Sequence, residues 1–330
     1  MIESPRTEEP AFRFARQCDI SLPLVFIDGI TRCGKSALSK VVPSLTRMEH
    51  IQFAEELELI VSGLSLGGLR KDYAAAFLRS HLNQKSYNLH ISRNVNFRPG
   101  DQTAVINYRN PEIYQERLTL EEGPENVERC RASDHYLPMQ THDLMANISL
   151  IQDLEINFRI LSLWRNPVEN IYSWWSRGWG VRFNNRDSTN FSLLIEDAEG
   201  NAYPWYVAGY HRQTLGMNAP EKCIAVACDM IERCIAGYRL KAEKDRTLLL
   251  FFEDICIDPD REVGRICDFL NVEKTEFTAP ALRDARLPRE IIQADLDMKI
   301  AAFREAVRPD IFDRLMQFQH AYLDTRYGLA

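Results

Sequence analysis

Short apolar runs alternate with amphipathic stretches along most of this chain. Mostly apolar runs at 24–27, 158–164 and 247–252 are typical of parallel strands, which are buried on both faces. Between these runs, apolar residues recur at helical spacing, as they do at 57–64, and the last part of the chain, 280–330, is amphipathic and helical. Strands that alternate with helices predict an α/β fold, with a central, mostly parallel sheet flanked by helices in three layers.

The same pattern predicts how the chain is organised. Residues 1–20 form a loose, charged leader, and residues 21–275 form the main domain. We expect a helical insertion in that domain at about 51–130 and a hairpin insertion at about 180–207. Residues 276–330 are expected to form a helical segment packed on the same domain.

Helix boundaries follow from prolines and from helix-capping residues. Ala219 and Pro220 are expected to open a long helix that runs to about 243, and a shorter helix is expected over 143–151. In the hairpin insertion, 191–195 and 203–207 are expected to pair as strands.

The first apolar run leads into a glycine loop. Residues 29–36, Gly-Ile-Thr-Arg-Cys-Gly-Lys-Ser, fit the pattern G-x-x-x-x-G-K-[ST], and a helical stretch follows them. A strand, this loop and a helix in succession predict a phosphate-binding loop (P-loop), in which backbone N–H groups surround an anion and basic side chains add charge. An ordinary glycine turn is the alternative. The residues expected to bind the phosphate are Gly29, Thr31, Arg32, Cys33, Gly34, Lys35 and Ser36.

Composition excludes several classes of function. The 330 residues carry a net charge of -7, so we expect no general nucleic-acid binding, and a bound anion must be held by local charge. No apolar run approaches the about 20 residues of a membrane span, and the leader lacks the apolar core of a signal peptide. The eight cysteines include no C-x-x-C pair, no His cluster has zinc spacing, and we expect no metal site. These features predict a cytoplasmic protein.

A second anion site is predicted where the strand at 158–164 ends. Arg165 opens the sequence Arg-Asn-Pro, and Pro167 is expected to start a helix. Ser173 follows Arg165 by eight residues, which is a little over two helical turns. Ligands of open α/β sheets bind at the carboxyl ends of strands, so these two side chains can converge on one anion, the arginine by a forked contact. A surface ion pair for Arg165 is the alternative.

This arrangement resembles the sulfotransferases that use 3′-phosphoadenosine 5′-phosphosulfate (PAPS). In that family an Arg opens R-N-P, a Ser stands eight residues on, and both bind the 3′-phosphate; Arg165 and Ser173 keep this spacing. Residues 31–36 resemble the family's loop for the 5′-phosphosulfate, with Arg32 at the basic position and Lys-Ser in place of a hydroxyl pair. The resemblance implies that the loop and Arg165 bind the two ends of one nucleotide.

His142 ends a Gln-Thr-His segment that resembles the K-T-H segment of the family, with Gln140 in place of the lysine. The resemblance implies that His142 is the general base, which takes a proton from the acceptor. Three alternatives stay open: His142 caps the helix at 143–151, His135 is the base, or the carboxylate of Asp143 takes that role.

The resemblance does not extend over the whole chain. It touches residues 24–40 and 136–270, where 248–270 is similar to the family's late strand and helix. It does not cover 51–130, and the final sixty residues contain no clear R-K-G loop, which completes the 3′-phosphate site elsewhere in the family. The late basic residues that could replace that loop are Arg283, Arg286 and Arg289.

The function implied is in-line transfer of the sulfuryl group from PAPS to a hydroxyl or amine of a small-molecule or saccharide acceptor. The other product would be 3′-phosphoadenosine 5′-phosphate (PAP), and no metal is required because Arg32 and Lys35 would neutralise charge on the departing phosphate. Trp175, Trp179 and Arg182 suit a sugar ring or an anionic acceptor, although packing in the core explains such aromatic residues equally well.

Two other functions stay open. In a P-loop kinase, Lys35 and Ser36 would bind ATP, and an acid at Glu253 or Asp254 would hold Mg²⁺. This interpretation leaves Arg165 and its spacing unexplained. The third hypothesis is a nucleotide-binding protein without catalytic activity. The sequence leaves the acceptor and the oligomeric state open, a homodimer included.

Overall fold

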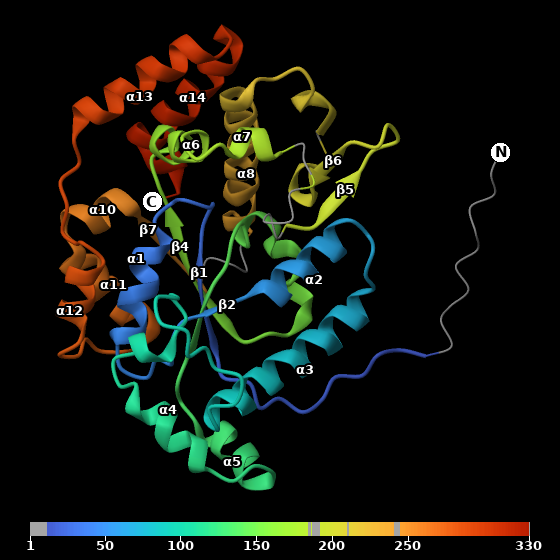
Figure 1. Cartoon of the computed structure of the whole chain (residues 1–330), viewed down its shortest axis with the longest axis vertical. Helices are drawn as coiled ribbons and strands as arrows, with labels where there is room; N and C mark the ends of the chain where they lie inside the picture. Colours follow the sequence, from blue (N-terminus) through green and yellow to red (C-terminus); the bar gives the residue numbers. More distant parts are fainter. Residues whose placement is uncertain (1–11, 184–185, 187–191, 210, 241–244, 330) are drawn as a thin grey trace.

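The computed structural model of the protein describes residues 12–183, 186, 192–209, 211–240 and 245–329. Within these ranges, five parallel strands form one sheet in the order β2-β3-β1-β4-β7 (Figure 1). Their bounds are Leu24–Asp28 for β1, Gln52–Phe53 for β2, Leu137–Gln140 for β3, Phe158–Trp164 for β4 and Thr247–Phe251 for β7. The predicted α/β class is confirmed, and the first strand of the chain lies at the centre of the sheet.

The side chains of β1 alternate between two apolar cores, one on each face of the sheet. Val25 and Ile27 pack in one core with the helices of the first face. Leu24 and Phe26 pack in the other core, on the opposite face. The helices of the first face are α1 (Lys35–Val41), α10 (Phe252–Ile257), α11 (Pro259–Leu270) and α12 (Thr278–Asp284).

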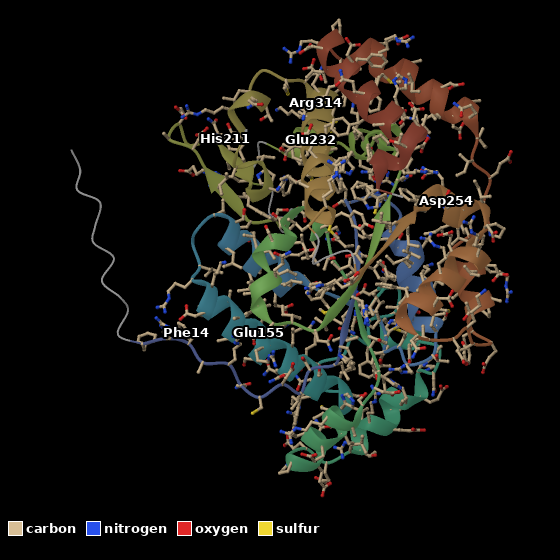
Figure 2. The ribbon with its side chains drawn as sticks, turned by 180° about the vertical axis from the view of Figure 1, so that it is seen from behind. Phe14, Glu155, His211, Glu232, Asp254 and Arg314 are labelled. Carbon is tan, nitrogen blue, oxygen red and sulfur yellow. The ribbon has the colours of Figure 1, made fainter. Side chains whose placement is uncertain are left out.

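The second face carries another set of helices. They are α2 (Glu55–Ser65), α3 (Lys71–His90), α6 (Pro167–Trp175), α8 (Ala219–Tyr238), α13 (Gln293–Ala306) and α14 (Pro309–Thr325). The C-terminal α14 is joined to α8 by an ion pair between Arg314 and Glu232, 3.3 Å apart (Figure 2). No helix within the described ranges combines the length and the apolar character that a membrane span needs.

The inserted segments differ from the prediction in two places. Gln52 and Phe53 lie in the stretch interpreted as helical, but they pair with β3 as a two-residue edge strand. The helix expected over 143–151 is instead a 3₁₀ helix, η4 (Met145–Leu150). After α3, the chain forms short helices: η2 (Val105–Asn107), α4 (Glu112–Glu116), η3 (Arg117–Thr119) and α5 (Pro124–Ala132).

The predicted hairpin has other strand bounds in the structure: its second strand covers only 202–204, and the residues expected to continue it form a 3₁₀ helix, η6 (Trp205–Val207). β5 (Leu194–Glu196) pairs antiparallel with β6 (Ala202–Pro204), and the Asp197 carboxylate accepts backbone N–H groups in the turn between them. Residues 191 and 241–244, which belong to the predicted hairpin and long helix, lie outside the described residues.

The described part of the predicted leader is bonded to the domain. The backbone N–H of Ile20 donates to Oδ1 of Asn83 on α3, at 3.0 Å. The backbone N–H of Phe14 donates to Oδ2 of Asp72 on the same helix, at 3.1 Å. Residues 12–20 therefore follow α3.

Candidate functional site

The loop between β1 and α1 lies at the carboxyl end of the sheet. Gly29 and Gly34 have φ angles of +149° and +108°, in the region that favours glycine. A Cβ on Gly29 would overlap the carbonyl oxygen of Leu163, and a Cβ on Gly34 would overlap the ring of Phe252. Both glycines are therefore required by the backbone angle and by close packing.

Lys35 is folded back inside this loop. Its side chain is buried, and Nζ donates a hydrogen bond to the carbonyl oxygen of Gly29. The base of the loop is fixed by Asp28, whose carboxylate accepts from Thr141 Oγ1 at 2.9 Å and from two N–H groups at the start of η4, also at 2.9 Å. Asp28 thus caps η4, which contradicts the alternative that His142 is its cap.

The structure brings three predicted residues together. Arg32 Nε donates to Ser173 Oγ at 3.3 Å, and Arg165 Nη1 donates to the backbone oxygen of Arg32 at 3.0 Å. Arg177, which the sequence did not single out, also donates to Ser173 Oγ, at 3.0 Å. Burial lowers the pKa of Arg32, and repulsion from Arg177 and Arg165 lowers it further, although a guanidinium stays charged at neutral pH. The result is a concentration of positive charge at the edge of the loop.

Two basic residues from the C-terminal part of the chain, Arg289 and Lys299, lie near Arg165. The Glu169 carboxylate accepts from Arg165 Nη2 at 2.9 Å and from Lys299 Nζ on α13 at 2.6 Å. The guanidinium of Arg289 lies 5.3 Å from the centroid of the Phe252 ring, and that of Arg165 lies 5.0 Å from it. Of the three late arginines singled out in the sequence, Arg289 therefore shares this ring with Arg165. No local pattern could have predicted Lys299, because the packing of α13 against α6 brings it there.

A cavity of about 840 Å³ opens beside the loop. Thr31, Gln140 and His142 line it where it meets the loop and β3. Neighbouring rings form an aromatic wall, with centroid separations of 5.3 Å for Trp174–Trp179, 6.2 Å for Trp174–Phe183, 6.4 Å for Phe183–Tyr206 and 6.2 Å for Tyr206–Trp205. This wall is bonded to the loop, since the indole N–H of Trp174 donates to the Thr31 carbonyl oxygen at 2.7 Å.

The structure separates the predicted acceptor-binding residues. Trp179 and Arg182, both on α7 (Trp179–Arg182), line the cavity. Trp175 does not line it; its ring packs on Phe303 of α13, with centroids 5.2 Å apart.

His142 is held by a carboxylate that the sequence did not reveal. Oε1 of Glu58 on α2 accepts the backbone N–H of His142 at 2.7 Å and lies 2.9 Å from its Nδ1. Both side chains line the cavity, and Nε2 has no hydrogen-bond partner among the residues described. A carboxylate can only accept a hydrogen bond, so Nδ1 of His142 carries the hydrogen. In the neutral ring, the lone pair of Nε2 is then available to take a proton.

The carboxyl of Asp143 also lines the cavity, but its pKa is shifted. Burial raises the pKa of its carboxyl well above the ordinary value, and Glu58 and Asp28 raise it further. These surroundings favour the protonated carboxyl, which is not a base, over the carboxylate that the alternative role of Asp143 requires.

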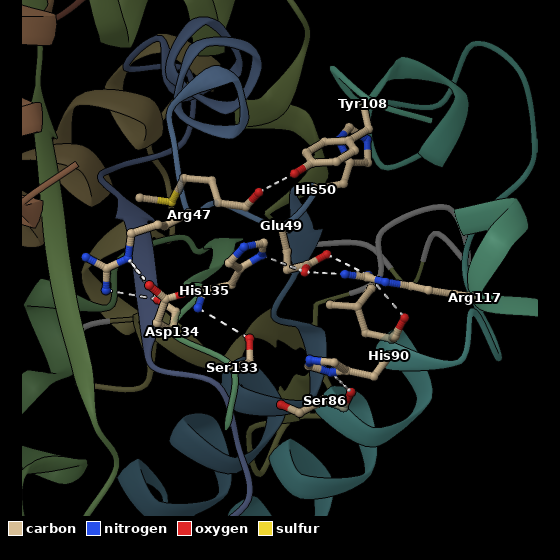
Figure 3. A network of polar contacts seen from close by, with 12 residues as sticks. Arg47, Glu49, His50, Ser86, His90, Tyr108, Arg117, Ser133, Asp134 and His135 are labelled. Atoms are coloured by element: carbon tan, nitrogen blue, oxygen red, sulfur yellow. Dashed lines mark hydrogen bonds and ion pairs between the residues drawn. The ribbon is translucent and has the colours of Figure 1, made fainter. Parts of the chain in front are cut away.

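His135 lies at the opposite edge of the sheet. It precedes β3, and its Nδ1 lies 3.0 Å from Oε1 of Glu49, which precedes β2 (Figure 3). Arg117 donates to both oxygens of Glu49, at 2.9 and 2.7 Å, and Tyr114 Oη donates to one of them, at 3.0 Å. His135 therefore belongs to a structural network, and it lines neither the loop nor the cavity.

The acids proposed for a kinase are both bonded to other protein groups. Glu253 accepts the backbone N–H of Asn166 at 2.9 Å and the hydroxyl of Tyr322. Asp254, on α10 (Figure 2), forms an ion pair of 3.3 Å with Arg326. Within the described part of the chain, no three His, Cys, Asp or Glu side chains gather in a way that could hold a metal ion.

A protein-family model matches most of the chain. The model of the sulfotransferase domain family matches residues 23–286. The chain is similar in structure to the sulfotransferase domain from the curacin biosynthetic pathway, with 13% identity and a TM-score of 0.45 over 92% of this chain and 98% of that one. The sulfotransferase domain of the Synechococcus PCC 7002 olefin synthase gives 15% identity and a TM-score of 0.44, over 96% and 98% of the two chains. A sulfotransferase from Alicyclobacillus acidocaldarius gives 15% identity and a TM-score of 0.38, over 90% of this chain and 96% of that one. No curated protein matches the chain.

Proposed function

This chain belongs to the sulfotransferase domain family, and on that premise we propose that it transfers the sulfuryl group of PAPS to a hydroxyl or amine of a small-molecule or saccharide acceptor. The observation that carries the proposal is the meeting of Arg32, Ser173 and Arg165 at the carboxyl edge of the sheet. These residues come from two strand-to-helix connections, and together they form a site for an anion.

The residues present fit a nucleotide with phosphate groups at both ends. Lys35, Arg32 and the loop would hold the 5′-phosphosulfate, because the loop contains a buried ammonium and has a guanidinium at its edge. Arg165 and Ser173 would hold the 3′-phosphate. PAPS, when bound, supplies the sulfuryl group.

Arg289 and Lys299 are proposed to complete the 3′-phosphate site in place of the family's R-K-G loop. Arg289 shares the Phe252 ring with Arg165, and Lys299 shares the Glu169 carboxylate with it. Both side chains thus place a positive charge beside Arg165, as a phosphate dianion requires.

The chain's own part in the chemistry is electrostatic stabilisation and removal of a proton. Arg32 and Lys35 stabilise the negative charge that develops on the departing phosphate. His142 accepts the acceptor's proton at Nε2, while Glu58 holds Nδ1–H and stabilises the imidazolium that forms. The cavity beside His142 binds the acceptor, with Trp179 and Arg182 among its contacts.

The alternatives explain less of the site. A kinase would need an acid free for Mg²⁺, whereas both Glu253 and Asp254 have protein partners. A nucleotide-binding protein without activity would not need His142 oriented by Glu58 at the wall of a large cavity. The proposal includes a cytoplasmic location, which the eight free cysteines support.

Calorimetric titration with PAP and with ATP, each with and without Mg²⁺, tests this function. We expect PAP to bind without metal, and Arg165→Ala to weaken binding by about 2–5 kcal/mol, the typical effect of removing one partner of a buried charge pair. Arg98→Ala is the matched control, since the Arg98 side chain is 81% exposed. Tight binding of Mg·ATP that is unaffected by Arg165→Ala would instead establish a kinase.

A further inference from the structure

A small cavity lies beneath the phosphate-binding loop, where α6 and α8 meet the end of the chain. Its volume is about 20 Å³. The loop contributes Gly29 and Cys33 to its wall, and α8 contributes Cys234. Tyr327, three positions before the last residue, also lines it. Arg165, which belongs to the proposed 3′-phosphate site, and Asn170 of α6 also line it.

Three of these side chains carry a buried polar atom without a hydrogen-bond partner among the described residues. They are Arg165 Nε, Asn170 Oδ1 and Tyr327 Oη. Asn170 is 4% exposed and Tyr327 is 8% exposed. Buried polar groups in folded proteins are nearly always hydrogen-bonded, so three such atoms on side chains that line one cavity favour a common partner.

The size and chemistry of the cavity fit one water molecule. A buried water needs about 10–15 Å³ and two to four polar partners. Its oxygen can accept the N–H of Arg165 and the O–H of Tyr327, and one of its hydrogens can be donated to Asn170 Oδ1. An ion fits less well, because a cation would meet the guanidinium and an anion would meet Asn170 Oδ1.

We propose that this cavity is a binding site for one structural water, which links Arg165 to Tyr327 at the C-terminal end of the chain. The two Nη groups of Arg165 already bond to the backbone oxygen of Arg32 and to Glu169. The water accepts the hydrogen bond of the Nε–H group. All three nitrogens of the guanidinium then have a partner, and its plane has one orientation toward the nucleotide. Tyr327 is therefore a positioning residue for PAPS, although it does not contact it.

The surroundings keep Tyr327 in the state that this link needs. Its ring packs 5.7 Å from that of Trp164 and 5.6 Å from that of Tyr322, measured between centroids, so the hydroxyl has a fixed position. Burial raises the pKa of the Tyr327 phenol, and the group remains a hydrogen-bond donor at neutral pH.

The test combines a high-resolution crystal structure with calorimetric binding of PAP to two variants. We expect a water peak within about 3.2 Å of the three atoms. We also expect Tyr327→Phe to weaken PAP binding by about threefold to tenfold, the effect of one hydrogen bond. Tyr203→Phe is the matched control, because Tyr203 Oη donates to Asp197 in the hairpin, and PAP should bind it as it binds wild type. Asn170→Ser is a second variant from the same cavity, and we expect it to weaken PAP binding as well.

The proposal is overturned by a dry cavity in a map that shows other buried waters. It is also overturned if Tyr327→Phe and Tyr203→Phe bind PAP with the same affinity. The affinity measurement rests on the proposed function, whereas the crystallographic one does not. If wild type fails to bind PAP, the proposed function fails, and the water peak still decides whether the site exists.

Discussion

Among the residues described, two of the glutamate–histidine pairs lie at opposite edges of the same sheet. At the carboxyl edge, Glu58 holds Nδ1 of His142 at 2.9 Å; at the amino edge, Glu49 holds Nδ1 of His135 at 3.0 Å. The residue types and the ring atom are the same, and the two distances are nearly equal. The burial of the two carboxylates and the space beside the two histidines differ.

The exposure of the carboxylate separates the two pairs, whereas the His135 side chain, at 31%, is exposed to nearly the same extent as that of His142. The side chains of His142 and Glu58 are 38% and 34% exposed and face the 840 Å³ cavity, whereas the Glu49 side chain is 1% exposed. Glu49 also accepts from Arg117 and Tyr114, so its charge is fully neutralised within the fold. Burial alone would raise the pKa of Glu49, but hydrogen bonds from Arg117 and His135 outweigh it and hold that pKa well below its usual range.

The comparison shows that a histidine and a carboxylate at hydrogen-bond distance do not by themselves indicate a catalytic site. The pair at the amino edge fastens the inserted segment that carries Arg117 to the strands that follow Glu49 and His135. The pair at the carboxyl edge leaves Nε2 of His142 available at a space large enough for a substrate. The first pair should contribute to stability and the second to turnover.

Replacing each histidine in turn is the most direct test of whether the two pairs have different roles. We expect His142→Ala to lower PAPS-dependent turnover by about 10²–10⁴-fold, the usual contribution of a general base. Its free energy of unfolding should change by about 0.5 kcal/mol or less, because the side chain is partly exposed. Release of PAP during incubation with a panel of hydroxyl and amine acceptors measures the turnover.

His135→Ala is the control for that measurement, and it should retain wild-type turnover at a temperature at which it is folded. Equal losses of turnover in both variants would show that the two pairs do not differ as proposed.

The next effect concerns the buried pair. We expect Arg117→Ala to lower the free energy of unfolding by about 3–5 kcal/mol, because it leaves the charge of Glu49 buried without its main partner. Urea unfolding measures this, and Arg98→Ala, at an exposed site, should change the value by about 0.5 kcal/mol or less. The double variant Glu49→Leu, Arg117→Met should recover much of the loss, since it removes both charges. A small effect of Arg117→Ala would mean that water reaches Glu49.

The smallest expected effect is a dependence on pH. The pKa of Glu49 is lower in the folded protein than in the unfolded chain, so its contribution to stability is complete above the ordinary pKa of about 4.3. That contribution is lost as pH falls through the folded-state pKa, at about 1.4 kcal/mol for each unit of pKa difference. The free energy of unfolding of wild type and of Glu49→Gln can be measured with urea from pH 7 downward. The difference between the two values should become smaller as the pH falls. A difference that stays constant would show that the Glu49 charge does not stabilise the fold.

What the sequence predicted well was local. Strand β4 was predicted with its observed bounds, Phe158–Trp164, because a strand buried on both faces has a mostly apolar sequence. Arg165 and Ser173 were predicted together because they lie on one strand-to-helix unit, in which spacing along the chain determines position in space.

What the sequence did not reveal depends on long-range packing. Glu58 lies on a helix of an inserted segment, and it meets His142 only because that helix packs beside the end of β3. Lys299 reaches Glu169 from α13, 130 residues further along the chain. The edge strand β2 is two residues long, which is too short for any periodic pattern to mark it.

The place of β1 in the sheet has a consequence for how the protein is made. Its partners are β3 and β4, whose first residues, Leu137 and Phe158, lie more than a hundred positions downstream. During synthesis, the apolar segment Leu24–Asp28 therefore emerges from the ribosome long before either neighbour exists. Until then it is an unpaired strand with high β-propensity, which other chains can add to. Slow translation between residues 28 and 164, or a chaperone that covers this segment, should decide how much of the newly made protein escapes aggregation.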